Sequence, residues 1–235
     1  MNNIDRYIKM NFSFIKGELI GLFCCTLFAS VGIFMPSLAI MVLLLLVVMI
    51  VLVVRVYTKV YSKTLFEEGA VLYQSLPFST NEIVVAKTFV VTVATLISMI
   101  GLMGGVTIGL AVLTAVVQEP EMIMESLELI NTFGPLGAAT MIFQILTQSF
   151  FWASIFFAST AVFKTTKEYG DRFIMTAIFV AVLSFQNTHL SDFAMIIAGE
   201  NLLIATMIAI VVKVMLGIGA CLVTRYYLDN KYILQ

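Results

Sequence analysis

Long apolar runs, separated by short polar segments, dominate the chain. Averaged over about 19 residues, they form six stretches, at 17–34, 36–54, 88–117, 134–163, 173–187 and 202–224. A helix of about 20 apolar residues crosses the hydrocarbon core of a bilayer. The pattern therefore predicts an all-α integral membrane protein, in which residues 1–235 form one domain with six transmembrane helices.

The segment before the first run, residues 3–16, has the period of an amphipathic helix. Ile4, Ile8, Phe12 and Ile15 share one face, and polar residues lie elsewhere. Such a helix lies on the membrane surface. We therefore expect an N-terminal amphipathic elbow helix before the first span, with a simple charged tail as the alternative.

The lengths of three apolar runs differ from that of a simple membrane-spanning helix. The runs at 88–117 and 134–163 exceed the hydrocarbon thickness, so we expect them to tilt or to project from the membrane. The run at 173–187 is short, and a small apolar stretch at 193–198 follows it after a polar interruption. This order predicts a re-entrant or interfacial segment between the fifth and sixth spans, because irregular backbone survives at membrane depth only where protein or water covers it.

Composition supports the membrane assignment and excludes other classes. Hydrophobic residues make up 61% of the chain and charged residues only 11%, against about 25% in soluble domains. The formal net charge is −1. These values argue against a soluble enzyme, a nucleic-acid-binding protein and a disordered chain, because so few polar residues would not cover a soluble fold.

The basic residues indicate the orientation of the spans. All of them except Lys213 fall before span 1, between spans 2 and 3, between spans 4 and 5, or after span 6. The segments 118–133 and 188–201 carry acidic residues and no Lys or Arg. Basic residues concentrate in cytoplasmic segments. We therefore expect a multi-pass protein of the plasma membrane, with both termini in the cytoplasm.

The chain lacks the residues of several catalytic centres. It has no G-x-x-x-x-G-K-[ST] phosphate-binding loop and only one histidine, His189. An intramembrane zinc protease needs a histidine cluster. The three cysteines all lie in apolar runs, where they are interpreted as small core residues. We therefore expect a non-catalytic chain that has no metal site and binds no cofactor of its own.

Two stripes of small residues are candidates for close helix packing. One lies in the third run, at Gly101, Gly105 and Gly109, and the other begins with the first span, at Gly17, Gly21, Cys25 and Ala29. Small residues at every fourth position let helix backbones approach closely. Each stripe is interpreted either as packing within one bundle or as an interface between subunits.

Strong polar features at membrane depth are few. Thr140, Gln144 and Gln148 lie on one face of the fourth span, and Lys213 lies near the middle of the sixth. The three polar residues are either hydrogen-bonding contacts between helices or the wall of a hydrated path. An ionisable residue inside a membrane indicates a functional site by default. Lys213 is expected to face a cavity or a carboxylate, or else to extend to the membrane surface.

The longest polar stretch lies between spans 2 and 3. Leu76–Pro77 ends a predicted helix at 64–76, because the residue before proline disfavours the α conformation. Ser79 and Glu82 form a capping box, so span 3 is expected to begin near Thr80. The predicted helix has apolar and aromatic side chains, and a movement of it would pass into span 3. Its candidate contact residues are Leu65, Phe66, Glu67, Glu68, Gly69, Leu72, Tyr73 and Leu76.

The pattern E-x-G-x-x-x-x-x-S-L-P-x-S-x-x-E-I-V-x-x-K in this stretch resembles the segment after the second helix in membrane subunits of type 2 ABC exporters. It is matched by Glu67, Gly69, Ser75, Leu76, Pro77, Ser79, Glu82, Ile83, Val84 and Lys87. The motif covers about twenty residues, while the predicted layout of elbow helix, six spans and re-entrant segment is similar throughout the chain. Thr80 stands where the family often has arginine.

The resemblance implies a permease with a coupling helix, at 64–76, that docks on a separate ATP-binding subunit present in two copies. ATP and Mg would be bound by that partner. A second membrane subunit, identical or different, would complete a dimer with the translocation path between the two. Small size and short outer segments look like exporters of amphipathic or antimicrobial peptides in Gram-positive bacteria, such as those for phenol-soluble modulins. Lipid-like molecules and drugs are also substrates of the family.

Two other functions remain open at the level of the sequence. One is a six-span substrate-binding component of a vitamin importer, for which residues 186–201 would supply a polar pocket near the outer face. It gives no reason for the motif between spans 2 and 3. The other is a passive channel or a secondary carrier, and carriers commonly show internal repeats. No clear repeat is evident in this chain.

Overall fold

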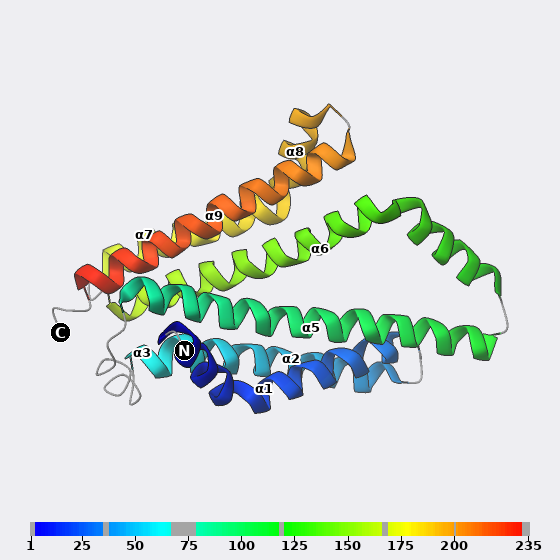
Figure 1. Ribbon diagram of the computed structural model, residues 1–235, viewed down its shortest axis with the longest axis horizontal. Coiled ribbons are helices and arrows are strands. Elements are labelled where there is room, and N and C mark those ends of the chain that lie inside the picture. The colour runs from blue at the N-terminus through cyan, green and yellow to red at the C-terminus, as the bar shows by residue number, and fades with distance from the viewer. Residues whose placement is uncertain are drawn as a thin grey trace.

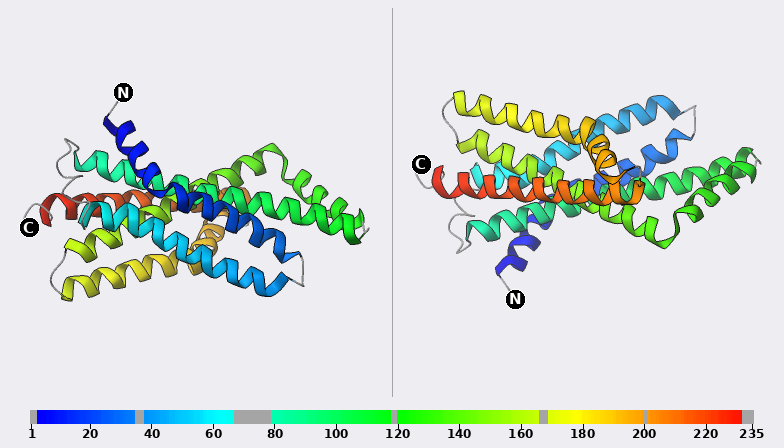
Figure 2. Two further views of the ribbon diagram at one scale, coloured as in Figure 1. Left: turned by 90° about the horizontal axis from the view of Figure 1, so that it is seen from below. Right: turned by 90° about the horizontal axis from the view of Figure 1, so that it is seen from above.

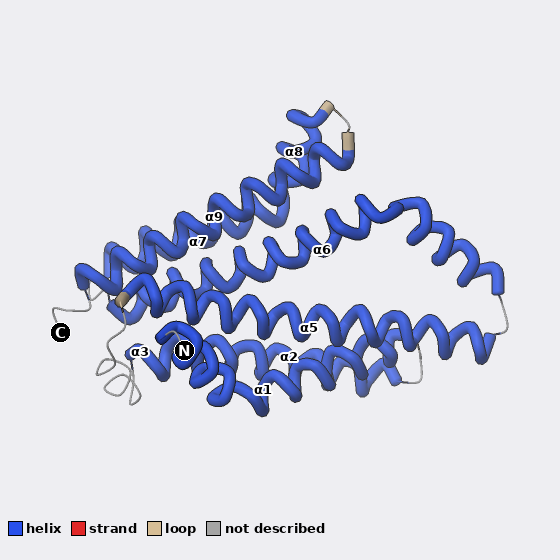
Figure 3. Tube along the Cα trace, viewed as in Figure 1, coloured by secondary structure: helices blue, strands red, loops and turns tan. Residues whose placement is uncertain are grey.

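The computed structural model describes residues 3–34, 38–66, 79–117, 120–165, 169–199 and 201–231, with no side chain described at 113–138. Helices make up almost all of this part of the chain, and it contains no strand (Figure 3). The order is α1 (Asn3–Ile33), α2 (Ala39–Tyr57), η2 (Thr58–Lys63), α3 (Thr64–Phe66), α5 (Thr80–Val117), α6 (Pro120–Thr165), α7 (Tyr169–Ser184), η3 (Phe185–His189), α8 (Leu190–Ala198) and α9 (Leu202–Lys231).

Within the described ranges, five helical stretches are long and apolar enough to cross a membrane. They are Ile4–Ile33, Ile40–Phe66, Thr80–Val112, Ile142–Thr165 and Leu203–Asn230. They correspond to the first four predicted spans and the sixth. In place of the fifth, α7 has 16 residues, or about 24 Å at 1.5 Å per residue, which is shorter than the hydrocarbon core.

Several helices extend beyond the predicted apolar runs. Helix α1 is continuous over Asn3–Ile33, so the predicted elbow is the first part of a longer helix rather than a separate element. Figure 2 shows that this first part is angled away from the remainder of α1. Helix α6 begins at Pro120, so the segment 118–133 is helical over most of its length. The 38 residues of α5 and the 46 of α6 exceed the length needed to cross a bilayer, as predicted.

The helices form two groups that meet at α5 and α6 (Figure 1). In the first group, α1 packs against both α2 and α5. In the second, α6 packs against α9 and α7, and the short helix α8 lies on α9. Of two apolar clusters, the first joins the two groups, because it also contains residues of α6 and α9, and the second lies within the second group. The first centres on Val60, Tyr61 and Val90, and the second on Phe151, Ile155 and Phe179.

The helix ends are sorted between the two ends of the molecule. Figure 1 shows the starts of α1, α5 and α7 and the ends of α3, α6 and α9 together at one end, which we call the basal end. The opposite end carries the end of α1, the start of α2, the end of α5, the start of α6 and helix α8. Apart from Lys213, the described Lys and Arg residues belong to helix ends that lie toward the basal end.

Two helix termini follow directly from local chemistry. Ser79 N donates to Glu82 Oε2 at 2.8 Å, and Glu82 N donates to Ser79 Oγ at 3.3 Å, which confirms the capping box and the start of the helix at Thr80. Helix α8 ends at Gly199, whose φ of 58° lies in the left-handed region. Glycine adopts that conformation without the steric penalty that other residues meet.

Candidate functional site

A buried lysine joins three helices at the basal end. The Lys87 side chain has no exposed surface and donates to Val60 O and Thr64 Oγ1. Its ammonium lies 5.6 Å from the centre of the Tyr7 ring, and Tyr7 is also buried. We call Tyr7, Val60, Thr64 and Lys87 the basal junction. It links the first turns of α1, the base of the second span and the start of α5.

The backbone at the base of the second span is adapted to this contact. Residues Thr58–Lys63 form the π-helical turn η2, which is wider than an α-helical turn. Thr64 Oγ1 donates to Val60 O at 2.6 Å, so this carbonyl accepts from both the hydroxyl and Lys87. A buried cation needs such oxygen partners to offset its lost hydration. Short π-helical turns frequently occur at functional positions.

The same turn is also attached to α1 and α6. Lys59 Nζ lies 2.6 Å from Glu18 Oε1 and 5.1 Å from the centre of the Phe14 ring. Tyr61 OH donates to Ala153 O at 2.9 Å, and the Tyr61 ring stacks on Phe157 with a centroid distance of 4.3 Å. The base of the second span is therefore fixed by charged, hydrogen-bonding and aromatic contacts.

The predicted ATPase-contact residues begin where this packed region ends. Leu65 is 5% exposed and lies in the first apolar cluster, and Phe66 packs against that cluster. The two side chains thus contribute to the interior of their own chain. The remaining candidates fall outside the described residues: Glu67, Glu68, Gly69, Leu72, Tyr73 and Leu76.

The glycine stripe of α5 lies directly against α1. A Cβ atom added to Gly101 would lie 2.9 Å from Phe23 O, and one added to Gly105 would collide with Leu27 O and Ser30 Oγ. At Gly109 an added Cβ would meet the Phe34 ring. This stripe therefore allows close backbone contact between two helices of the same chain.

The small residues of α1 are divided between contacts and free surface. An added Cβ at Gly21 would lie 3.1 Å from the Leu52 side chain of α2, and Ala29 is 4% exposed. Cys25 is half-buried. Gly17 is exposed and has no neighbour within 4 Å of such a Cβ. Gly17 is thus the member of this stripe with the most open surroundings.

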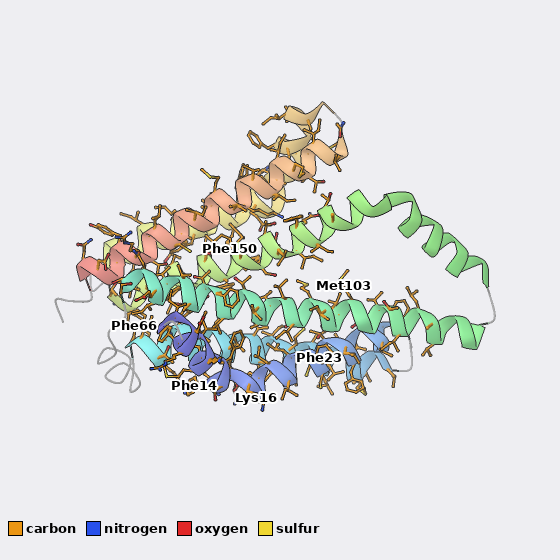
Figure 4. All side chains as sticks on the ribbon, in the orientation of Figure 1. Phe14, Lys16, Phe23, Phe66, Met103 and Phe150 are labelled. Atoms are coloured by element: carbon orange, nitrogen blue, oxygen red, sulfur yellow. The ribbon has the colours of Figure 1, made fainter. Side chains whose placement is uncertain are left out.

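Contacts between α6 and α9 show where Lys213 lies along the length of the bundle. A Cβ added to Gly217 would lie 2.5 Å from Phe150 Cε1, and Cys221 Sγ donates to Ser154 Oγ at 3.4 Å. Figure 4 shows Phe150 between the two helices. The two helices therefore run side by side in the same direction. Lys213 precedes Gly217 by one turn of α9, so it lies one turn closer to the α8 end than this contact does.

Polar side chains of α6 and η3 lie at about the same level along the bundle as Lys213 of α9. Gln186 of η3 donates from Nε2 to Gln148 Oε1 at 3.3 Å, and Thr147 Oγ1 donates to Phe143 O at 2.9 Å. Each of these residues, like Lys213, lies about one helical turn closer to the α8 end than the second apolar cluster, which contains Phe151, Val182 and Leu216. We call Thr147, Gln148, Gln186 and Lys213 the polar layer.

The structure places two of the predicted path residues, Gln148 and Lys213, at about the same level of the bundle, with no printed contact between them. Gln148 lies in the polar layer with Lys213, while Thr140 and Gln144 continue its face of α6 toward the opposite end, where Gln144 is exposed. Gln186 was not predicted as the partner of Gln148, because the two are 38 positions apart. Lys87 was counted only among the basic residues between spans 2 and 3, and the structure shows that it is buried.

A signal for Lys87 was present in the sequence. Lys87 lies three positions after Val84 and four before Val91, both of which are buried in α5. It therefore falls on the apolar face of that helix.

Comparisons with protein-family models, with characterised proteins and with solved structures found no match to the chain.

Proposed function

We propose that this protein is the permease subunit of an ATP-driven exporter of the type 2 ABC class in a bacterial plasma membrane. It would cross the membrane six times, with α7 and η3 forming the fifth span. Together they cover residues 169–189, or about 30 Å of helix, which matches the hydrocarbon core. Helix α8, with exposed apolar side chains such as Ile196, would be the interfacial segment between spans 5 and 6.

The proposed orientation places the basal end in the cytoplasm. Lys59, Lys63, Lys164, Arg172 and Arg225 belong to helix ends that meet there (Figure 1). Basic residues concentrate on the cytoplasmic side of membrane proteins. Both chain termini and the segment between α3 and α5 would then face the cytoplasm, where an ATP-binding partner is available.

The basal junction is the observation that carries the proposal. The segment 67–78 begins directly after α3 and ends directly before α5, and Lys87 joins the bases of these two helices. A load applied to the segment would therefore reach the second and third spans and α1 together. A coupling element requires this property, because packed elements pass displacement to their neighbours.

The partners follow from this role. Two copies of a separate ABC ATPase would bind ATP and Mg and dock on residues 67–76. The membrane subunit itself would catalyse no reaction. A second membrane subunit, identical or different, would complete the translocation path beside the polar layer. The substrate would be an amphipathic peptide, a lipid-like molecule or a drug.

A co-purification experiment tests the proposal. Tagged wild-type protein from the source membrane should bring down a protein with a Walker-A ATPase sequence. Leu72→Asp should abolish its recovery, because an unpaired buried charge is strongly destabilising in an interface. The variant should retain the melting temperature of the purified membrane protein.

Asn81→Asp is the matched control for this experiment. Asn81 is exposed in the first turn of α5, where an added negative charge favours the helix. This variant should recover the ATPase as well as wild type does. Absence of any ATPase with the wild type, or full recovery with Leu72→Asp, would contradict the proposed coupling role.

A further inference from the structure

A pocket lies between α2 and α5, with α1 along its third side. Helices α2 and α5 pack along α1 rather than along each other. The space between them has a volume of about 200 Å³, and its lining includes Leu22 of α1, Tyr57 of α2 and Ala94 of α5. We call it the α2–α5 pocket. Its lining residues all belong to helical stretches that are long and apolar enough to cross a membrane, so the pocket would lie within the hydrocarbon core.

The α2–α5 pocket is closed at the end that lies nearer the basal junction. The lining residues Leu22 and Val91 are at most 2% exposed there. The Tyr57 ring closes the same end and packs against Phe156 of α6, with a centroid distance of 4.7 Å. At the other end, Leu102 of α5 is 44% exposed. The pocket therefore opens away from the basal end, where a bilayer would supply hydrocarbon.

The hydroxyl groups along the α2–α5 pocket have hydrogen-bond partners within the protein. Three of them donate to a carbonyl one turn back in their own helix: Thr26 to Leu22, Thr95 to Val91 and Ser98 to Ala94. The Tyr57 hydroxyl is hydrogen-bonded to the Thr95 side chain. The other lining side chains are apolar. A cavity with apolar walls stays dry and takes up apolar ligands, so this pocket is suited to a hydrocarbon rather than to a polar head.

Two methionines and one tyrosine favour an aromatic ligand in this pocket. Met49 and Tyr57 line it from α2, and Met99 lines it from α5. Methionine sulfur makes favourable contacts with aromatic rings, and its flexible side chain adapts to ligands of different shape. A tyrosine ring packs well against a second ring, edge to face or offset. An apolar cavity of about 150 Å³ holds benzene, so the α2–α5 pocket has room for one substituted ring.

We infer that the α2–α5 pocket binds a small apolar aromatic molecule, a single ring with a short substituent, taken up from the hydrocarbon core of the membrane. The ring would lie among Met49, Tyr57 and Met99, and the substituent would extend toward the open end at Leu102. The site is formed by one chain and requires neither an ATPase nor a second membrane subunit. It therefore goes beyond the proposed function. Its ligand would contact α2 and α5, the two spans whose bases the basal junction connects.

Photolabelling with an apolar aromatic probe tests this inference. The purified protein in phosphatidylcholine nanodiscs is irradiated with 3-trifluoromethyl-3-phenyldiazirine, and labelled residues are identified by mass spectrometry. Labelling of pocket residues should saturate, whereas labelling of Leu43, which is 64% exposed on α2, should rise in proportion to the probe. Toluene and methylcyclohexane, which share a carbon skeleton, serve as aromatic and saturated competitors. Toluene should displace the probe from the pocket at a bilayer concentration about tenfold lower, which corresponds to about 1.4 kcal/mol.

Three variants connect the labelling to the α2–α5 pocket. Ala94→Leu fills the pocket from α5 and should abolish saturable labelling. Ala181→Leu makes the same change at an exposed position of α7 and should retain it. Met49→Leu combined with Met99→Leu removes both sulfur atoms and nearly conserves volume, which cores tolerate well. This double variant should still bind the probe but should lose the preference for toluene. It provides the decisive comparison if Ala94→Leu does not fold.

Several results would overturn the inference. Labelling of pocket residues that rises in proportion to the probe, as at Leu43, would mean that the probe reaches them only as a solute of the lipid. Equal displacement by toluene and methylcyclohexane in the wild type would indicate a site for alkyl chains. Saturable labelling that survives Ala94→Leu, or an undiminished preference for toluene in the double methionine variant, would place the binding elsewhere. Because the chain is tested alone, these results are independent of whether an ATPase co-purifies with it.

Discussion

At the scale of single residues, Lys87 shows how a charged side chain can hold a membrane protein together. Its ammonium donates to Val60 O and Thr64 Oγ1 and faces the Tyr7 ring. These groups come from three segments that lie far apart in the sequence. The side chain therefore fixes the base of the bundle, rather than adding to the exposed basic surface around it.

Replacing Lys87 tests this role. Lys87→Met removes the charged donor and keeps a side chain of similar length. Hydrogen bonds to charged groups contribute about 1.5–3 kcal/mol, and a protein of this size loses about 2–4 °C per kcal/mol. The apparent melting temperature in detergent should therefore fall by about 5 °C or more. Lys63→Met, at an exposed position of η2, should leave the melting temperature unchanged. An equal or higher melting temperature for Lys87→Met would show that burial of the charge outweighs its hydrogen bonds.

Residue chemistry explains which local features were predictable. The Ser79–Glu82 capping box depends on residues three positions apart, so it was evident in the sequence, and the structure confirms it. The π-helical turn η2 and the Gln148–Gln186 contact depend on neighbours supplied by other helices. No local pattern identifies such neighbours, so these features became evident only in the folded chain.

At the scale of helices, the stripe of α5 provides a matched pair of glycines. Gly105 lies against Leu27 O and Ser30 of α1, whereas Gly104 has no neighbour within 4 Å of an added Cβ. Gly105→Ala should separate the two helices and lower stability by about 1–3 kcal/mol, the usual effect of overpacking. Gly104→Ala should be neutral or raise stability by up to about 1 kcal/mol through helix propensity.

Apparent melting temperatures of the two variants in detergent measure this difference. A lower value for Gly105→Ala alone would agree with the α1–α5 contact. Equal values for the two variants would contradict it, since the substitutions have the same chemistry and differ only in their surroundings. Cross-linking between copies of the chain through Gly105 would instead assign the stripe to a subunit interface.

Helix lengths were predicted less well than helix positions. Each apolar run lies largely within helix in the structure, but α1 and α6 extend through the polar segments 3–16 and 120–133. The hydropathy pattern locates the part of a helix that suits lipid. It does not reveal where the backbone hydrogen bonding stops, because charged residues such as Arg6 and Lys9 are good helix formers.

At the scale of the whole molecule, the sorting of basic residues predicts the orientation in the membrane. In a variant without the three native cysteines, Ser191→Cys on α8 should react with an impermeant thiol reagent on intact cells. Lys164→Cys at the basal end should react only after the membrane is opened. Both positions are exposed in the structure. The opposite labelling pattern would invert the proposed topology.

The arrangement of the two helix groups was not predictable from the sequence. Stripes of small residues indicated close packing of α1 and of α5, within one bundle or between subunits, but they did not identify the partner of either helix. The pairing of α6 with α9, which determines the position of Lys213, rests on Phe150 against Gly217 and on Ser154 against Cys221. The second of these contacts joins positions 67 residues apart, beyond the range of any periodicity argument.

The central claim is that residues 67–76 dock on a separate ATPase, and site-specific photo-cross-linking tests it most directly. A photoreactive amino acid at Leu72 in membranes of the source organism should cross-link to a protein with a Walker-A ATPase sequence. The same group at Ser191, on α8 at the opposite end of the bundle, should not. Cross-linking of no ATPase from Leu72, or of the same protein from both positions, would contradict the account.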